Sequence, residues 1–330
     1  MIELFHGSNI DWLGKRKLFL VISGSLMALG MISLLAKGGF RYGVDFRGGT
    51  IVRVRFQERP PVEQIRTLLR ENGAQDSVIQ ELRGAGAGAN DVIIEFEGAS
   101  EEADASLGRE IITSALNKGF QAKFEVVSAT SVGPKVGADL RRQAVFATLY
   151  ALGGILVYIA FRFEWIYGAA AVFAVFHDTL VTLGLFSLFN REINLTVIAA
   201  LLTLVGYSVN DTIVVFDRVR ENLKIRRRDD LSAIMNDSIN QTLSRTILTS
   251  GLTFLTVLAL FIFGGEIINH FAFAMVIGII VGTYSSIAIA APLVLVYTNV
   301  RGRMAVRPLA PARSASAKTP RPAKIPAKVK

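Results

Sequence analysis

The sequence has no cysteine and few charged residues, and both shortages restrict what the chain can be. Without cysteine there is no disulfide framework, no thiolate metal site and no cysteine nucleophile. Charged residues make up only 19% of the 330 residues, whereas hydrophobic residues make up 51% and the mean hydropathy is +0.43. Such a composition is too apolar for an ordinary soluble domain. It therefore indicates a membrane protein.

Acidic residues are missing from the C-terminal segment 299–330, and this shortage explains the formal net charge of +9. The segment carries nine of the 36 basic residues and five of the nine prolines, and the remainder balances 27 basic against 27 acidic residues. Basic, proline-rich sequence of this kind is typical of a disordered extension. The charge therefore predicts a disordered tail over 299–330, and no nucleic acid partner.

Six uninterrupted apolar runs are long enough to cross a bilayer, which takes about 20 residues. The first, 18–36, follows the basic segment 1–17 and has no small-residue cleavage site, so we expect an uncleaved signal anchor. The other five lie within 143–298, and the last is interrupted by Pro292. They cover residues 144–161, 165–190, 193–216, 246–265 and 271–296. The predicted fold is an α-helical polytopic membrane protein with six transmembrane helices.

Lys and Arg are concentrated in the connections on one side of these spans. Segment 1–17 ends in Lys15, Arg16 and Lys17, the loop 217–244 carries six basic residues, and the tail carries nine. The opposite connections, 191–192 and 264–270, have almost none. Because basic residues favour the cytoplasmic side, both termini are predicted to be cytoplasmic in a bacterial inner membrane protein. The same topology makes 37–142 periplasmic.

The polar region 37–142 has the pattern of a small folded domain. Alternating residues predict four strands and amphipathic faces predict two helices, with a glycine-rich turn at 84–88 between the middle strands. The strands are expected at 50–56, 77–83, 91–97 and 121–130, and the helices at 60–72 and 100–118. The order β-α-β-β-α-β predicts a ferredoxin-like α+β periplasmic domain.

Four ionisable residues fall within or at the ends of the apolar spans, where each costs about 2.5 to 3.5 kcal/mol to insert and so needs a partner or a function. They are His177, Asp178, Asp211 and Arg245. Asp211 shares a polar helical face with Asn210, and Arg245 begins a face continued by three threonines, so we predict an Asp211–Arg245 pair near the cytoplasmic side. Such a pair is either part of a proton path or a structural clamp between helices.

His177 and Asp178 lie near the middle of the third span. They are candidates for supporting the proton path or for a satisfied helix–helix hydrogen bond, and we rank Asp178 below Asp211. No set of His, Asp and Glu has the spacing of a metal site, and neither a nucleophile–base set nor a phosphate-binding loop is present. The sequence therefore predicts neither an enzyme nor a metal or organic cofactor.

The segment 42–50, Tyr-Gly-Val-Asp-Phe-Arg-Gly-Gly-Thr, resembles the signature of the SecD/SecF family of the bacterial protein-export machinery. The similarity recurs at His177-Asp178, most specifically over 206–222, and again at 244–246 and 282–286, so it runs from the first span to the last. The residues of the family motifs before and after the polar domain are Gly43, Asp45, Gly48, Gly49, Gly133 and Pro134.

This resemblance implies an architecture and a mechanism. Family members look like half of a resistance-nodulation-division transporter, pair with SecD, and associate with the SecYEG channel, YajC and YidC. They use the proton, as the coupling ion, to promote movement and release of exported unfolded polypeptides in the periplasm. Asp211 and Arg245 match residues implicated in proton conduction, and a further carboxylate comes from SecD. Protonation of Asp211 would then release Arg245 and let the helices shift.

Two other functions stay open at this point. One is a proton-coupled half-transporter that exports small molecules or lipids, although the small polar domain offers little room for a porter. The other is a membrane scaffold that holds partners near the channel without transporting anything. Proton flux through a complex with SecD would separate the scaffold from the motor.

Overall fold

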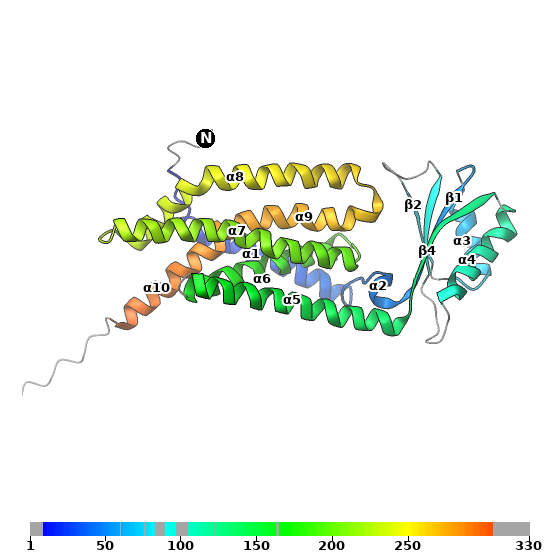
Figure 1. The fold of residues 1–330 in the computed structure, drawn as a ribbon, viewed down its shortest axis with the longest axis horizontal. Coiled ribbons are helices and arrows are strands. Elements are labelled where there is room, and N and C mark those ends of the chain that lie inside the picture. The colour runs from blue at the N-terminus through cyan, green and yellow to red at the C-terminus, as the bar shows by residue number, and fades with distance from the viewer. Residues whose placement is uncertain are drawn as a thin grey trace, which may run out of the picture.

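The computed structural model describes residues 9–59, 61–75, 77–82, 90–96, 105–121, 123–162 and 165–305. The helices form a long bundle, and a four-stranded sheet with two helices stands at one end of it (Figure 1). The first described residues and the last helix lie at the opposite end of the bundle (Figure 1). The predicted glycine-rich turn at 84–88 and segment 306–330 of the predicted tail lie outside the described residues.

Six helical segments of the described chain are long and apolar enough to cross a membrane, as the hydropathy predicts. The chain is therefore a multi-pass membrane protein. The spans are α1 (Arg16–Ala36), α5 (Pro134–Arg162), α6 (Trp165–Leu188), α7 (Leu195–Ile225), α8 (Leu231–Phe263) and a last segment built from α9 (Glu266–Ser285), a π-helix (Ser286–Ala290) and α10 (Ala291–Ala305). The buried residues of the bundle are concentrated on α6, α7 and the last segment, whereas few residues in the apolar parts of α1, α5 and α8 are buried.

Several helices extend beyond the apolar runs. The first polar turns of α5 begin at Pro134, and α7 and α8 leave only 226–230 between them, so most of the predicted loop 217–244 is helical. Hydropathy indicates only the part of a helix that lies in lipid, whereas capping groups determine where the helix begins. Asn194 caps α7 by accepting a hydrogen bond from Val197 N, and Asp230 caps α8 by accepting one from Ser232 N. At the other end, α10 continues to Ala305, so 299–305 are helical and not part of a disordered tail.

The last span changes its hydrogen-bond pattern just before Pro292. Proline has no N–H to donate to a carbonyl four residues earlier, and its ring displaces that carbonyl. The wider turn of the π-helix Ser286–Ala290 accommodates the missing hydrogen bond and the displaced carbonyl. The α-helix α10 then begins at Ala291, with Pro292 in its first turn. The predicted break is thus a local widening of a continuous helix.

The polar region folds into a sheet covered by helices on one face (Figure 1). In chain order its elements are β1 (Gly49–Phe56), α3 (Val62–Glu71), β2 (Val78–Glu81), β3 (Asp91–Phe96), α4 (Ala105–Phe120) and β4 (Phe124–Val132). The strands lie in the order β2-β3-β1-β4, and neighbouring strands are antiparallel. Val52 and Ile94 of the sheet pack with Ile65 of α3 and Ile112 of α4, all fully buried. Burial of these apolar side chains holds the two layers together.

Candidate functional site

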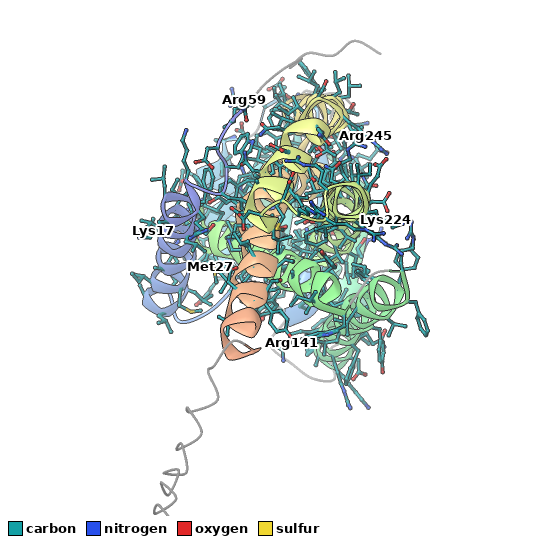
Figure 2. All side chains as sticks on the ribbon, turned by 90° about the vertical axis from the view of Figure 1, so that its left-hand side faces the viewer. Lys17, Met27, Arg59, Arg141, Lys224 and Arg245 are labelled. Carbon is teal, nitrogen blue, oxygen red and sulfur yellow. The ribbon has the colours of Figure 1, made fainter. Side chains whose placement is uncertain are left out.

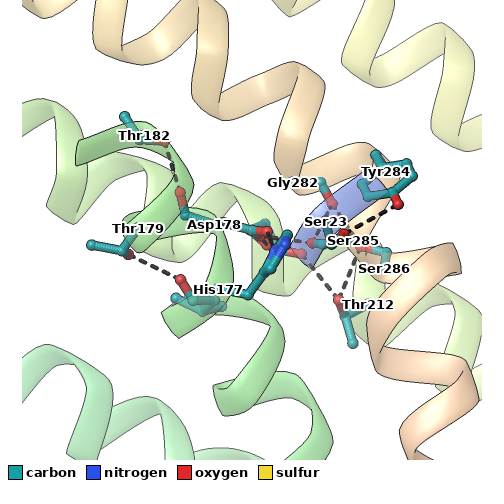
Figure 3. Close-up of polar contacts among 12 residues, drawn as sticks. Ser23, His177, Asp178, Thr179, Thr182, Thr212, Gly282, Tyr284, Ser285 and Ser286 are labelled. Carbon is teal, nitrogen blue, oxygen red and sulfur yellow. Dashed lines mark hydrogen bonds and ion pairs between the residues drawn. The ribbon is translucent and has the colours of Figure 1, made fainter. Parts of the chain in front are cut away.

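A buried carboxylate, Asp178, lies where three helices of the bundle meet. Its side chain has no exposed surface, and its Oδ2 accepts hydrogen bonds from Ser208 of α7 at 2.6 Å and from Ser285 of α9 at 2.7 Å. On the other side, Asp178 Oδ1 lies 3.0 Å from His177 Nδ1. Figure 3 shows the side chains of Asp178, His177 and Ser285 close together. Among the described residues, the partners of this carboxyl group are therefore hydroxyl and imidazole groups and not an Arg or Lys.

The cluster continues along hydroxyl groups toward the π-helix. Thr212 Oγ1 of α7 lies 3.0 Å from Ser286 Oγ, and both Ser285 and Ser286 also reach the carbonyl of Gly282 (Figure 3). The carbonyl oxygen of Gly282 accepts hydrogen bonds but cannot donate, so these contacts hold the helices together and do not form a continuous path for a proton. The side chain of His177 is 4% exposed, and its Nε2 has no hydrogen-bond partner among the described residues.

Close contact between α7 and α9 makes this geometry possible. A Cβ on Gly282 would lie 3.1 Å from the Cβ of Ser208, closer than side chains normally approach. The glycine therefore lets the two backbones come together near Asp178. Ser285 lies in the same turn as Gly282, so the close approach also brings its hydroxyl to the carboxylate.

Asp211 forms a second buried carboxylate site, on the same helix α7. It is 2% exposed, and its Oδ2 accepts a hydrogen bond from Ser250 of α8 at 2.8 Å. Ser208 and Asp211 are one helical turn apart on α7. This helix therefore provides both the Ser208 hydroxyl that binds Asp178 and the second carboxylate, Asp211. Asn210, in contrast, lies on the exposed face of α7.

The predicted contact between Asp211 and Arg245 is not present in this chain. No ion pair within 4 Å joins these two described residues, and the Arg245 side chain is exposed although its charge still acts on Asp211 through space. Figure 2 shows Arg245 on the side of the bundle away from Lys17 of α1. The spacing of polar residues in the sequence predicts that Asp211 and Arg245 lie at a similar depth. It does not reveal that Ser250 donates a hydrogen bond to Asp211.

The glycine motif and Pro134 meet at the junction of the sheet and the bundle. Here α2 (Val44–Arg47) begins after Gly43, whose N–H donates to Ile193 O at 2.9 Å, and Asp45 Oδ2 accepts from Leu195 N at 2.9 Å. Gly48 has φ +85° and a Cβ there would lie 2.7 Å from the Cα of Pro134. Gly133 precedes Pro134, and Gly49 begins β1. These motif residues thus join the sheet to α5 and to the start of α7.

Sequence reasoning ranked the two carboxylates and missed the hydroxyl groups that bind them. Ser208, Ser250 and Ser285 are ordinary residues in transmembrane sequence, where serine most often bonds to its own helix. Ser208 and Ser285 do fall within the segments 206–222 and 282–286 that resemble the family. No group of three His, Cys, Asp or Glu that could hold a metal occurs within the described ranges.

Six apolar helices that bury two carboxylates define a multi-pass helical membrane protein. Two family models match the chain. The model for "Protein export membrane protein SecD/SecF, C-terminal" covers residues 112–300, and that for the "SecD/SecF GG Motif" covers residues 33–58. The chain belongs to the SecD/SecF family of protein-export membrane proteins.

Relatives of full length are similar to the chain throughout. The protein translocase subunit SecF of Calditerrivibrio nitroreducens is 46% identical over 90% of this chain and 97% of its own, and that of Koribacter versatilis is 42% identical over 91% and 95%. The crystal structure of SecDF, a translocon-associated membrane protein from Thermus thermophilus, is 39% identical with a TM-score of 0.76. It matches 89% of this chain but only 39% of its own, so this chain spans about two fifths of SecDF.

Proposed function

We propose that this chain is a SecF-type accessory subunit of Sec protein export and that, with SecD, it uses the proton motive force to promote translocation and release of polypeptides. Family membership supports the export role, and the fused SecDF relative supports SecD as the partner. The observation that carries the proton role is the pair of buried carboxylates, Asp178 and Asp211, bound by serine hydroxyls near the centre of the bundle.

The proposal includes an orientation in the membrane. The chain lies in the inner membrane with both termini in the cytoplasm, and the sheet of residues 49–132 faces the periplasm. The strand order β2-β3-β1-β4 with two helices on one face supports the ferredoxin-like assignment of this domain. In this position it would meet exported polypeptides as they leave SecYEG, and YajC and YidC would be further partners.

Protonation of Asp211 is the proposed coupling step. Asp211 and the exposed Arg245 lie on α7 and α8, whose outer faces also carry Asn210 and the hydroxyls of Thr203 and Thr249. A polar face of this kind does not suit lipid but suits a second polar helix, so we place SecD against it. Arg245 would then pair with a carboxylate of SecD when Asp211 is protonated. Each proton that crosses 100 mV contributes about 2.3 kcal/mol to the helix movement.

Substitution of Asp211 tests the proposal. Asp211→Asn keeps an acceptor for Ser250 but no longer titrates, so the complex with SecD should assemble while proton-dependent export in energised vesicles is lost. Asp217→Asn, an exposed carboxylate on the same helix, is the matched control. Export at the wild-type rate by Asp211→Asn would contradict the proton role. Loss of assembly would instead support a structural clamp, and assembly with export but no proton flux would support a scaffold.

A further inference from the structure

An apolar groove with a volume of about 380 Å³ lies between α1, α8 and α9, and its wall includes Ser250, the hydrogen-bond donor to Asp211. Its walls include Trp12, Phe19, Phe254, Ile279 and Ile280. Ile280 is 55% exposed, so the groove opens at the outer surface of the bundle, where the bilayer surrounds it. A groove of this volume has room for part of a lipid acyl chain.

The residues that line the groove change with depth. Counted inward from the end where α1 begins, the groove passes Trp12, then the level of Phe19 and Tyr284, whose rings are 5.8 Å apart, and then Ile280. At the middle level lie Thr246 of α8 and Thr283 of α9, which both line the groove. The far end, which holds Phe254 and Ile279, is apolar. The surface of the groove is thus almost wholly apolar, and the hydroxyls of the two threonines lie buried in its walls.

The two threonines are the unusual feature of this region. Most threonines of the described helices bond back to a carbonyl of their own helix, as Thr249 does to Arg245 O at 3.0 Å. The hydroxyls of Thr246 and Thr283 are buried with no hydrogen-bond partner among the described residues, and Thr246 is only 2% exposed. A buried hydroxyl without a partner costs about as much as a lost hydrogen bond. A threonine in a helix has two accessible side-chain rotamers, so each hydroxyl can turn toward a ligand in the groove.

Two basic residues precede the groove-lining residue Phe19 by about one helical turn, at the end of the groove that holds Trp12. Lys15 and Arg16 precede Phe19 by four and three residues, so they share its helical face, whereas Lys17 lies on another face. Neither Lys15 nor Arg16 forms an ion pair with another residue that the structure describes. Trp12 is held in place by a hydrogen bond from its Nε1 to Asn240 Oδ1 at 3.2 Å and by stacking on Phe19. Basic residues, buried hydroxyl groups and apolar surface therefore follow one another from this end of the groove.

We propose that this groove is a specific site for one anionic glycerophospholipid of the leaflet at the N-terminal end of α1. Its phosphate would bind Lys15 and Arg16, its ester carbonyls would accept hydrogen bonds from Thr246 and Thr283, and one acyl chain would lie against Phe254 and Ile279. A basic pocket between helices at this depth is a typical site for an anionic headgroup. A transmembrane helix of a partner subunit is the competing occupant, but it would leave Lys15 and Arg16 without an anion.

The first test uses the fluorescence of Trp12. In a Trp165→Phe background, Trp12 is the one tryptophan left of the two in the chain. The full chain, with a SecD whose tryptophans are replaced by phenylalanine, is placed in nanodiscs of phosphatidylcholine that contain a few per cent of acyl-brominated phosphatidylglycerol. We expect quenching that saturates at a low fraction of this lipid, and several-fold weaker quenching by brominated phosphatidylcholine at the same fraction. Equal quenching by the two lipids would overturn the proposal.

Two matched pairs of variants locate the site. A Cβ on Gly251, which lines the groove, meets nothing within 4 Å, and the same is true of Gly24 on the exposed surface of α1. Gly251→Leu should therefore fill the groove and abolish the saturable quenching, while Gly24→Leu leaves it unchanged. Lys15→Gln should raise the half-saturating lipid fraction several-fold, and Lys17→Gln should not.

Native mass spectrometry of the same complexes provides a readout independent of Trp12. Retained phosphatidylglycerol should decrease in Lys15→Gln and in Thr283→Val, which removes the hydroxyl but keeps the shape of the side chain. If Gly251→Leu failed to fold, these two variants would still decide the question. Unchanged retention in both would contradict the proposal. Photo-crosslinking from position 280 to SecD instead of to lipid would show that a partner helix fills the groove.

Discussion

Asp45 Oδ2 accepts a hydrogen bond from the backbone N–H of Leu195 at 2.9 Å, so a side chain that precedes the sheet caps the helix that carries Asp211. Asn194 caps the same helix end by accepting from Val197 N at 3.0 Å. The backbone reinforces the link, because Ile193 N donates to Arg41 O at 2.8 Å and Gly43 N donates to Ile193 O. These hydrogen bonds tie the start of α7 to the segment that leads into the sheet.

Removal of the Asp45 carboxylate should weaken this connection. Asp45→Ala loses both the hydrogen bond to Leu195 and a negative charge at a helix N-terminus, and we expect it to lower the free energy of unfolding by about 1 kcal/mol. Asp45→Asn keeps an acceptor oxygen and should lose less. Hydrogen exchange at the Leu195 amide and the thermal midpoint of the purified chain measure the effect. Asp217→Ala, on the exposed surface of α7, is the control, and an equal loss in that variant would argue against the cap.

Asp178 should tolerate replacement by an amide far better than by an apolar residue. Asp178→Asn keeps an oxygen for Ser208 and Ser285, whereas Asp178→Leu leaves both hydroxyls and His177 buried without this partner. Each unsatisfied buried group costs about 1 to 3 kcal/mol, so Asp178→Leu should be poorly assembled and Asp178→Asn close to wild type in thermal midpoint. If Asp178→Asn assembles but exports at the rate seen without a proton gradient, Asp178 takes part in proton transfer. Wild-type export by that variant would restrict its role to packing.

Hydropathy and periodicity could predict the six spans and the strands and helices of the polar region, because lipid and core impose simple patterns. They could not predict where α5 begins or that α10 reaches Ala305, because polar helical turns outside the membrane follow capping and tertiary contacts. The choice of Asp211 and Asp178 followed from the cost of burying charge. The hydrogen-bond partners of these carboxylates could not be predicted from the sequence. Helix packing brings Ser208, Ser250 and Ser285 to them, and no pattern in a single sequence reveals that packing.

Arg245 offers a test of where its partner lies. Within this chain its side chain is exposed and forms no ion pair with a described residue, so Arg245→Gln should change the free energy of unfolding of the isolated chain by less than about 0.5 kcal/mol. The same variant should weaken the complex with SecD or its proton-dependent export. Arg228→Gln, which removes an exposed arginine from the short connection between α7 and α8, is the control. A large loss of stability in isolated Arg245→Gln would mean that the arginine supports this bundle itself.

A glycine can be required either because its φ is positive or because a Cβ would clash with a neighbour. Comparison of Gly48 with Gly38 separates these two reasons at the junction between the bundle and the sheet. Both have positive φ, +85° and +73°, but a Cβ on Gly48 would lie 2.7 Å from the backbone of Pro134, whereas one on Gly38 meets nothing within 4 Å. Alanine at Gly38 should therefore cost only backbone strain, on the order of 1 kcal/mol. Alanine at Gly48 adds a clash with backbone that cannot rotate away, so α2 and α5 must move apart.

We expect Gly48→Ala to lower the thermal midpoint more than Gly38→Ala and to increase hydrogen exchange in β1 and in the first turns of α5. Since Asp45 lies on the same short helix, the displaced α2 should also release the Leu195 amide, which Gly38→Ala should leave protected. Equal effects of the two substitutions would mean that backbone strain alone determines the requirement for glycine. In that case contact between Gly48 and Pro134 would not be what joins the sheet to the bundle.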